Sequence, residues 1–219
     1  MPGDTNQTVP LRAIRGHTFL DRFGSDPLVV DLGANVGHFA QGFRDAYPSA
    51  RLVLVEGDPL LVRALVERFG ATPGVRLFQG VVGPENQPSV PFFLSGVPEG
   101  NSTSRSFSES WSAEPSRPIS VEMITLARLF ELVEPSRVDL LKVDIEGAEW
   151  EVLAGLTPAL ADRIDQITVE FHDFMDPTER PRTERCIAQL EGLGFRSHCR
   201  GAEHRHGSPF FDCLFYRDG

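Results

Sequence analysis

The sequence predicts an α/β fold in which helices cover both faces of a doubly wound, mostly parallel sheet. Short apolar runs alternate along the chain with segments of helical periodicity, which is typical of repeated strand-helix-strand units. The first run ends in a glycine-rich turn, and the second ends in an acid that a helix follows. Because a crossover between parallel strands requires such a helix, these observations favour one parallel sheet.

The first half of the chain contains three strands and two helices. Residues 27–32 and 51–56 are short apolar runs, as expected of buried parallel strands, and residues 75–82 are a third strand. Residues 38–47 have helical periodicity and end before Pro48. Asp58 is a typical N-cap with Pro59 at the first helical position, so a second helix begins there and ends near Gly70.

The second half continues the alternation. Strands are expected at residues 138–144 and 167–171, and two more in the tail at 195–199 and 210–216. One helix is expected to begin near Ala148, and another to cover residues 183–193. Residues 84–118, rich in Ser, Pro and Gly, are predicted to form a loop insertion with one strand at 90–94. The segment 95–118 is longer than an ordinary connection, so we expect a functional lid there. The alternative is a surface insertion.

Length and composition indicate a single domain, residues 1–219, with residues 1–26 as an N-terminal extension. The chain has 31 acidic and 21 basic residues, and a net charge of −10 would repel nucleic acid. We find no signal peptide and no membrane-spanning run, so we expect a cytoplasmic protein without a membrane partner. The sequence leaves the oligomeric state open.

The three cysteines, Cys186, Cys199 and Cys213, are odd in number and widely spaced. This pattern predicts neither a disulfide framework nor a thiolate zinc site, and we expect them to be small buried apolar residues. His204 and His206 form a small candidate metal patch, for which an exposed polar turn is the favoured alternative.

The glycine turn and the acid after it indicate a nucleoside site. Gly33 and Gly37 stand where a strand turns into a helix, so the backbone can approach a ligand closely at the helix N-terminus. Glu56 ends the second strand, where a carboxylate can accept hydrogen bonds from both ribose hydroxyls. A dinucleotide would require GxGxxG, and Asn35 suits that spacing poorly, so a nicotinamide-dependent oxidoreductase is the weaker alternative.

Three motifs resemble those of a known family. VVDLGANVG at residues 29–37 and VEGDP at 55–59 resemble the first two motifs of class I S-adenosylmethionine-dependent methyltransferases. LLKVDIEGAE at residues 140–149 resembles more narrowly the signature of the FkbM-type methyltransferases, and the similarity extends from about Val29 into the tail. The resemblance implies a Rossmann-like sheet of seven strands with one antiparallel strand, and O-methylation of a sugar, lipid or polyketide-like metabolite.

The resemblance also implies cofactor contacts. By position, the resemblance implies that Glu56 would face the ribose of S-adenosylmethionine and that Val81 or Val82 would face the adenine. The methionine part would be faced by Asp31, Gly33, Asn35 and Gly37. Two positions depart from the family pattern. Ala127 stands where members often have an acid, which puts a role for that acid in doubt, and Gly57 stands where many have Pro, which leaves ribose binding intact.

Candidate catalytic residues follow two neighbouring strands. Lys142, Asp144 and Glu146 end the fourth strand, and Glu170, His172 and Asp173 end the fifth. The carboxyl ends of neighbouring parallel strands bring these side chains to one crevice. A hydroxyl acceptor requires a general base, a metal ion or both. Asp144 is our first choice, and His172 is a plausible base because its unperturbed pKa is about 6.5.

Alternatives remain at several of these positions. A metal site would use Asp144, His172 and Asp173, with Mg²⁺ favoured by the carboxylates and Mn²⁺ by the histidine. Lys142 and Glu149 have a structural ion pair or a helix cap as alternative roles. The whole chain could also be a non-catalytic nucleoside-binding module. The acceptor, a small molecule with a hydroxyl group, is not identified by the sequence.

Overall fold

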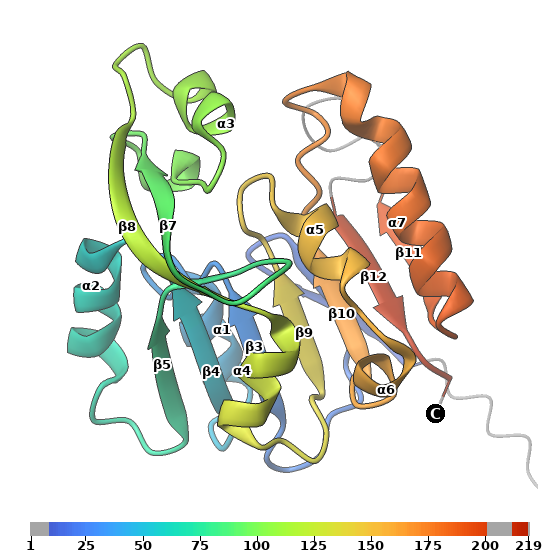
Figure 1. The fold of residues 1–219 in the computed structure, drawn as a ribbon. Coiled ribbons are helices and arrows are strands. Elements are labelled where there is room, and N and C mark those ends of the chain that lie inside the picture. Colours follow the sequence, from blue (N-terminus) through green and yellow to red (C-terminus); the bar gives the residue numbers. More distant parts are fainter. Residues whose placement is uncertain (1–8, 201–211, 219) are drawn as a thin grey trace, which may run out of the picture.

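A seven-stranded sheet forms the centre of the molecule in a computed structural model, which describes residues 9–200 and 212–218 (Figure 1). Its strands are β3 (Leu28–Leu32), β4 (Arg51–Glu56), β5 (Val75–Gln79), β9 (Leu140–Val143), β10 (Gln166–Val169), β11 (Arg196–Arg200) and β12 (Asp212–Tyr216). Their order is β11-β12-β10-β9-β3-β4-β5, and only β12 runs antiparallel to its neighbours. The predicted fold class, including the single antiparallel strand, is confirmed.

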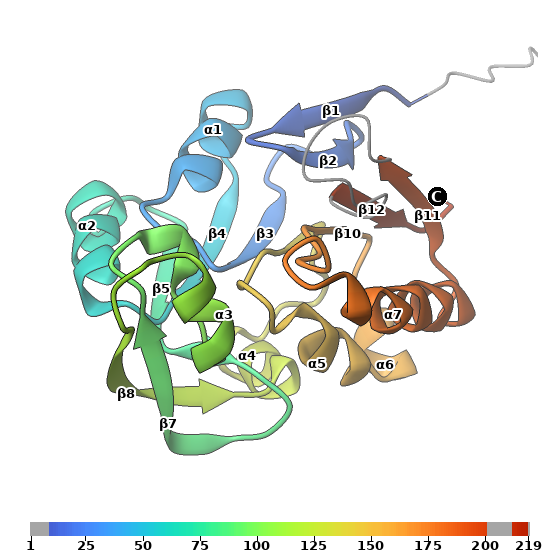
Figure 2. The same ribbon diagram turned by 90° about the horizontal axis from the view of Figure 1, so that it is seen from above.

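Helices cover both faces of this sheet, as a doubly wound fold requires (Figure 2). On one face, α1 (His38–Ala46) and α2 (Pro59–Phe69) pack with a core cluster that includes Val29, Leu52 and Leu140. On the other face, α4 (Leu126–Val133), α5 (Glu149–Ala154), α6 (Pro158–Ala161) and α7 (Arg180–Gly192) pack on Val30 and Leu141. Adjacent strand residues thus enter opposite cores, which explains the continuous apolar runs of the sequence.

A second sheet stands beside the first. It contains β6 (Val81–Val82), β7 (Gln87–Leu94) and β8 (Arg117–Ile124), and the connection between β7 and β8 carries η1 (Pro98–Gly100) and α3 (Arg105–Ser110). The predicted single strand over residues 75–82 is therefore wrong. Gly80, at φ 156°, separates β5 from β6, and a Cβ atom there would lie 2.7 Å from the carbonyl oxygen of Glu122. The predicted insertion thus contains a strand longer than expected and two short helices.

Several elements were not predicted. An N-terminal hairpin, β1 (Leu11–Ile14) and β2 (His17–Leu20), lies within the predicted extension, and α4 and α6 were missed. Helix α7 begins before the predicted residue 183, since a proline at position 181 is compatible with the first helical turn. Residues 201–211, which include His204, His206 and the start of the last predicted strand, lie outside the described residues.

The cysteine prediction needs correction. Cys199 and Cys213 form a disulfide between β11 and β12, whereas Cys186 is free and buried, as expected. Antiparallel pairing places Cys199 directly opposite Cys213, a relation that cysteine spacing alone does not reveal. Disulfides persist mainly in oxidising compartments, so this bond does not favour the predicted cytoplasmic location. None of the described helices is long and apolar enough to cross a membrane.

Candidate active site

The glycine turn after β3 is compact because it passes under the end of β9. Gly33 has φ 77°, and a Cβ atom there would lie 1.8 Å from the carbonyl oxygen of Asp144. Gly37 is the N-cap of α1 in the left-handed region, and a Cβ atom there would meet the ring of Phe69 at 2.6 Å. Gly33 therefore brings the turn against the candidate catalytic strand, whereas Gly37 serves the packing of α1 on α2.

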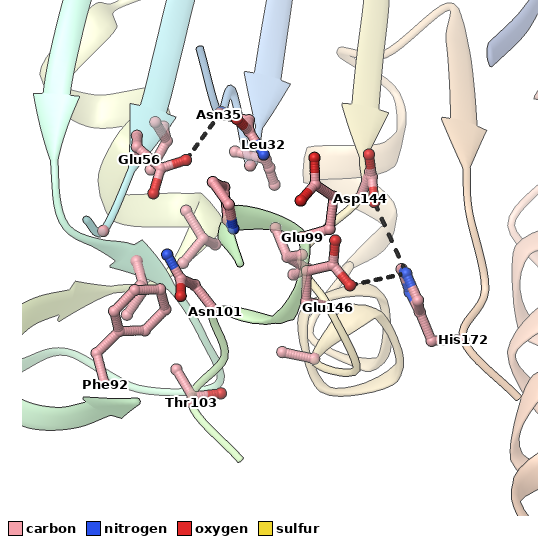
Figure 3. Close-up of a pocket in the computed structure, with 18 of the residues that line it drawn as sticks. Leu32, Asn35, Glu56, Phe92, Glu99, Asn101, Thr103, Asp144, Glu146 and His172 are labelled. Atoms are coloured by element: carbon pink, nitrogen blue, oxygen red, sulfur yellow. Dashed lines mark hydrogen bonds and ion pairs between the residues drawn. The ribbon is translucent and has the colours of Figure 1, made fainter. Parts of the chain in front are cut away.

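The carboxylate of Glu56 is held in place by backbone groups. It accepts a hydrogen bond from the N–H group of Asn35 at 2.8 Å (Figure 3). It accepts another from the N–H group of Asp58, also at 2.8 Å, and its side chain is buried. Burial raises the pKa of Glu56, and the two N–H groups act in the opposite direction. Glu56 therefore presents a fixed carboxylate at the end of β4, where the sequence placed a ribose contact.

A cavity of about 230 Å³ lies between Glu56 and the ends of β9 and β10. Gly33, Asn35, Glu56, Val81 and Val82, five of the seven predicted cofactor residues, line it. Asp31 and Gly37 do not. Residues that the sequence did not name as site residues also line it: Phe92 from β7, and Glu99, Asn101 and Thr103 from the β7-β8 connection (Figure 3). Trp111 of the same connection lines it too.

Lys142 lies between two carboxylates beneath the cavity. Its Nζ is 3.0 Å from Asp31 Oδ1 and 3.3 Å from Asp144 Oδ2, and it donates to the carbonyl oxygen of Gly33 at 2.7 Å. Burial opposes the charge of Lys142, but Asp144 and Asp31 prevail and raise its pKa. This geometry supports the structural alternative for Lys142, because the ammonium group joins β3 to β9 and does not line the cavity.

Asp144 follows β9 and lines the cavity. Burial favours a higher pKa, but Lys142 and the N-terminal His17 outweigh it, and the pKa of Asp144 is held well below its ordinary value. A carboxylate with such a low pKa is a weak base. Asp144 is therefore better suited to hold a fixed negative charge than to remove a proton.

His172 is surrounded by carboxylates. Its Nδ1 lies 3.0 Å from Glu149 Oε1 and its Nε2 lies 3.1 Å from Glu146 Oε2, while Glu170 Oε1 and Asp144 Oδ1 are 3.7 and 3.9 Å from Nε2. Burial lowers the pKa of His172, but Glu149 and Glu146 prevail and raise it well above 6.5. Both ring nitrogens are thus engaged, and a protonated imidazole cannot accept the proton of an alcohol.

Glu146 and Glu170 are the cavity-lining carboxylates that titrate near neutral pH. Burial raises the pKa of Glu146 to about 7, and burial together with Asp144 raises the pKa of Glu170 to about 8. The sequence placed Glu170 at the end of the fifth strand without giving it a role. Glu149 does not line the cavity, and its carboxylate accepts from the N–H groups of Ile145 and Gly147, which fits the predicted cap.

The predicted metal ligands are only partly gathered. Ligand atoms of Asp144, Glu146 and His172 lie within 4.8 Å of one another. Asp173 is not in this group: its side chain is fully buried, and Arg180 Nε lies 3.7 Å from its Oδ2. Asp144, Glu146 and His172 could hold a divalent cation only after His172 loses its proton, because its Nε2 lies 3.1 Å from Glu146 Oε2, and Glu146 would then take the place of Asp173.

The β7-β8 connection covers the cavity and is attached to its rim. Asn101 Nδ2 donates to Asp58 Oδ2 at 2.9 Å, and Ser102 Oγ donates to the carbonyl oxygen of Glu146 at 2.6 Å. The ring of Phe107 contacts the edge of His172 with centroids 5.4 Å apart. These contacts link the cover to both the ribose end and the acidic end of the cavity.

The strand order and the glycine turn beside a fixed strand-end carboxylate define a class I methyltransferase fold. The FkbM methyltransferase structure from Methylobacillus flagellatus matches 89% of this chain and 44% of its own length, with a TM-score of 0.56 and 15% identity. S-adenosylmethionine is the cofactor of class I methyltransferases. A sequence model of the methyltransferase FkbM domain matches residues 31–197. The chain belongs to the FkbM methyltransferase family.

Three relatives give this assignment a context. The AMB antimetabolite synthetase AmbE of Pseudomonas aeruginosa is 26% identical over 89% of this chain, which spans only 11% of that protein. Methyltransferase 1 of Beauveria bassiana is 30% identical, covering 79% of this chain and 74% of its own length. The 2-O-methyltransferase NoeI of Sinorhizobium fredii is 28% identical, and the match covers 59% of this chain and 57% of that protein.

Proposed function

We propose that this chain transfers the methyl group of S-adenosylmethionine to a hydroxyl group of a small molecule. The observation that carries the proposal is one cavity with a fixed carboxylate, Glu56, at one end and the carboxylates of Asp144, Glu146 and Glu170 at the other. The name of the relative NoeI, a 2-O-methyltransferase, supports transfer to oxygen.

The cofactor end fits a nucleoside. Glu56 is oriented by backbone N–H groups and can accept from ribose hydroxyls, while Val81 and Val82 offer an apolar wall to a base. When bound, S-adenosylmethionine supplies an electrophilic methyl group on a positively charged sulfur. The acidic end of the cavity suits that positive charge.

The acidic end can receive the proton of the acceptor. The acceptor oxygen forms a bond to the methyl carbon as the carbon-sulfur bond breaks, and the hydroxyl proton passes to a carboxylate. We assign this step to Glu170, which lines the cavity and is not paired with Lys142. Asp144 and His172, the residues first predicted for it, orient the acceptor and the neighbouring carboxylates instead.

A divalent cation is a second element of the proposal. Asp144, Glu146 and His172 would hold it, and it would lower the pKa of the acceptor hydroxyl. The test is Mn²⁺ titration followed by electron paramagnetic resonance. Binding that is lost in Glu146→Gln and kept in Asp176→Asn, an exposed control, supports the ion, whereas turnover after EDTA dialysis with no Mn²⁺ binding rejects it.

The charge of the cavity narrows the acceptor class. Five carboxylates, Glu56, Glu99, Asp144, Glu146 and Glu170, line it, whereas His172 is the one cationic side chain among the described lining residues. An acceptor with a phosphate or carboxylate group would be repelled. We therefore propose a neutral or cationic acceptor.

The experiment that tests the function is incubation of the pure protein with S-adenosylmethionine and a panel of methyl glycosides, aliphatic alcohols and macrolactone alcohols. We expect release of S-adenosylhomocysteine and a product heavier by one methylene group. Cofactor binding without any product would favour the alternative of a non-catalytic nucleoside-binding module. Absence of cofactor binding would reject the proposal altogether.

A further inference from the structure

His17, in the N-terminal hairpin, contacts the acidic cluster although it does not line the cavity. Its Nε2 lies 3.4 Å from Asp144 Oδ2, and its side chain is 4% exposed. The match to the family model begins at residue 31, so this residue lies outside the matched segment. No sequence motif drew attention to it, because its position depends on how the hairpin packs.

The two oxygens of Asp144 have different neighbours. Oδ2 is within 3.4 Å of two nitrogen atoms, Lys142 Nζ and His17 Nε2. Oδ1 lies on the side of His172, at 3.9 Å from its Nε2, where the carboxylates of the cavity gather (Figure 3). Two donors on one oxygen fix the carboxylate plane and leave the other oxygen for the contents of the cavity.

The local backbone explains how His17 comes to this position. Arg15 and Gly16 both have positive φ, at 53° and 95°, as the two central residues of a type I′ hairpin turn do. This turn pairs Ile14 with His17 and makes His17 the first residue of β2. Its ring then packs edge-on against Phe39 of α1, with centroids 5.4 Å apart.

The hairpin is firmly attached to the sheet. The backbone N–H and Oγ1 of Thr18 donate to the carboxylate of Asp212 at 3.3 and 2.6 Å. Gln166 accepts from the N–H of Leu20 and donates to its carbonyl oxygen, and Phe19 is fully buried in the core. His17 is therefore presented by a fixed support, as a positioning residue must be.

We propose that His17 is a positioning residue for methyl transfer, which donates from Nε2 to Asp144 Oδ2 and, together with Lys142, holds Asp144 Oδ1 toward the reacting groups. The proposal rests on the proposed function for its catalytic meaning. It makes the N-terminal hairpin part of the active centre, whereas no sequence motif predicts a role for residues 1–26. The alternative is that His17 only fills space against Phe39.

Two variants separate these roles. His17→Gln keeps a donor near the position of Nε2, and His17→Phe keeps the packing without a donor. Loss of a hydrogen bond to a charged group should lower kcat by about tenfold to a hundredfold in His17→Phe, with most of the activity kept in His17→Gln. The fastest alcohol of the acceptor panel is the substrate, and cofactor affinity should change little in both variants.

The matched control is His198→Phe, the same substitution at an exposed histidine of the edge strand β11. We expect this control to keep the wild-type kcat. If His17→Phe keeps the wild-type kcat, or if His17→Gln loses as much activity as His17→Phe does, the positioning role is overturned.

A second measurement does not depend on turnover. Nitrogen-15 spectra of histidine-labelled protein, with the signal of His17 assigned from His17→Gln, should show a shift of its Nε2 resonance in Asp144→Asn. No shift would overturn the contact whatever the enzyme activity. A clear shift in a protein that methylates no member of the panel would instead reject the proposed function and keep the contact, so the two failures are distinguishable.

Discussion

At the scale of single residues, the sequence predicted side chains whose position follows directly from a strand end. Glu56, Asn35 and Asp144 belong to this group, because the end of a parallel strand fixes where the next few residues lie. His17 could not be predicted this way, since a hairpin turn and a packing contact bring it to Asp144. The roles of Asp144 and His172 also required the structure, because their protonation depends on partners such as Lys142 and Glu149.

Glu56→Ala should weaken S-adenosylmethionine binding by about tenfold to a hundredfold, because hydrogen bonds from ribose to a charged acceptor are lost. Isothermal titration calorimetry measures this change. Glu67→Ala, on the exposed side of α2, is the control and should bind like wild type. Equal affinity in Glu56→Ala and wild type would show that Glu56 does not contact the cofactor.

Glu170→Gln should lower kcat by about 10²-fold to 10⁴-fold, the range for loss of a general base, with little change in cofactor affinity. A base must be deprotonated to act, and burial and Asp144 raise the pKa of Glu170 to about 8 in the ligand-free protein. Wild-type kcat should therefore decrease as the pH falls below the pKa that Glu170 has in the complex with the cofactor. A pH profile of Glu170→Gln that keeps the wild-type shape would assign the base elsewhere.

At the scale of elements, strands and helices with strong periodicity were predicted well, and the errors occurred where tertiary contacts decide the outcome. Gly80 ends β5 because the chain there passes close to Glu122 of β8, and no property of residues 75–82 alone reveals this. The predicted loop insertion contains β7 and a helical tip, and β7 forms its strand pairing with the distant β8, which begins at the end of the insertion. The role of this tip as a lid stays a prediction.

The cover between β7 and β8 should exchange its amide hydrogens more slowly when cofactor is bound. If the cover opens only when the cavity is empty, a cofactor concentration of about 100 times Kd should lower the rate of amide exchange through this opening by about a hundredfold. Hydrogen exchange with mass spectrometry of residues 101–111 measures the effect. Peptides from α7, which packs beside the edge strand β11, are the control. Equal protection in free and bound protein would identify the segment as a fixed structural insertion.

At the scale of the whole molecule, fold class and strand order followed from the alternation of strands and helices, but the covalent link in the tail did not. The disulfide Cys199-Cys213 joins the two final strands, which also contribute Asp212 to the anchoring of the N-terminal hairpin. The disulfide thus joins β11 to β12, and Asp212 of β12 in turn holds the hairpin that carries His17. Cysteine spacing missed it because strand pairing, which sequence distance does not encode, sets the partners.

Removal of this disulfide should therefore destabilise the whole domain. The two cysteines are 14 residues apart, and closing a loop of that size stabilises a fold by about 3 kcal/mol. For a domain of this length, that loss corresponds to a decrease in melting temperature of roughly 6 to 12 °C. Differential scanning calorimetry of the Cys199→Ser, Cys213→Ser double variant measures it.

The control is a count of reactive thiols in the wild-type protein without reductant. Burial raises the pKa of the free Cys186 to about 12, so the native protein should show no reactive thiol. The denatured protein should show only one. Three reactive thiols in the denatured protein, or an unchanged melting temperature in the double variant, would show that the bond does not stabilise the domain in solution.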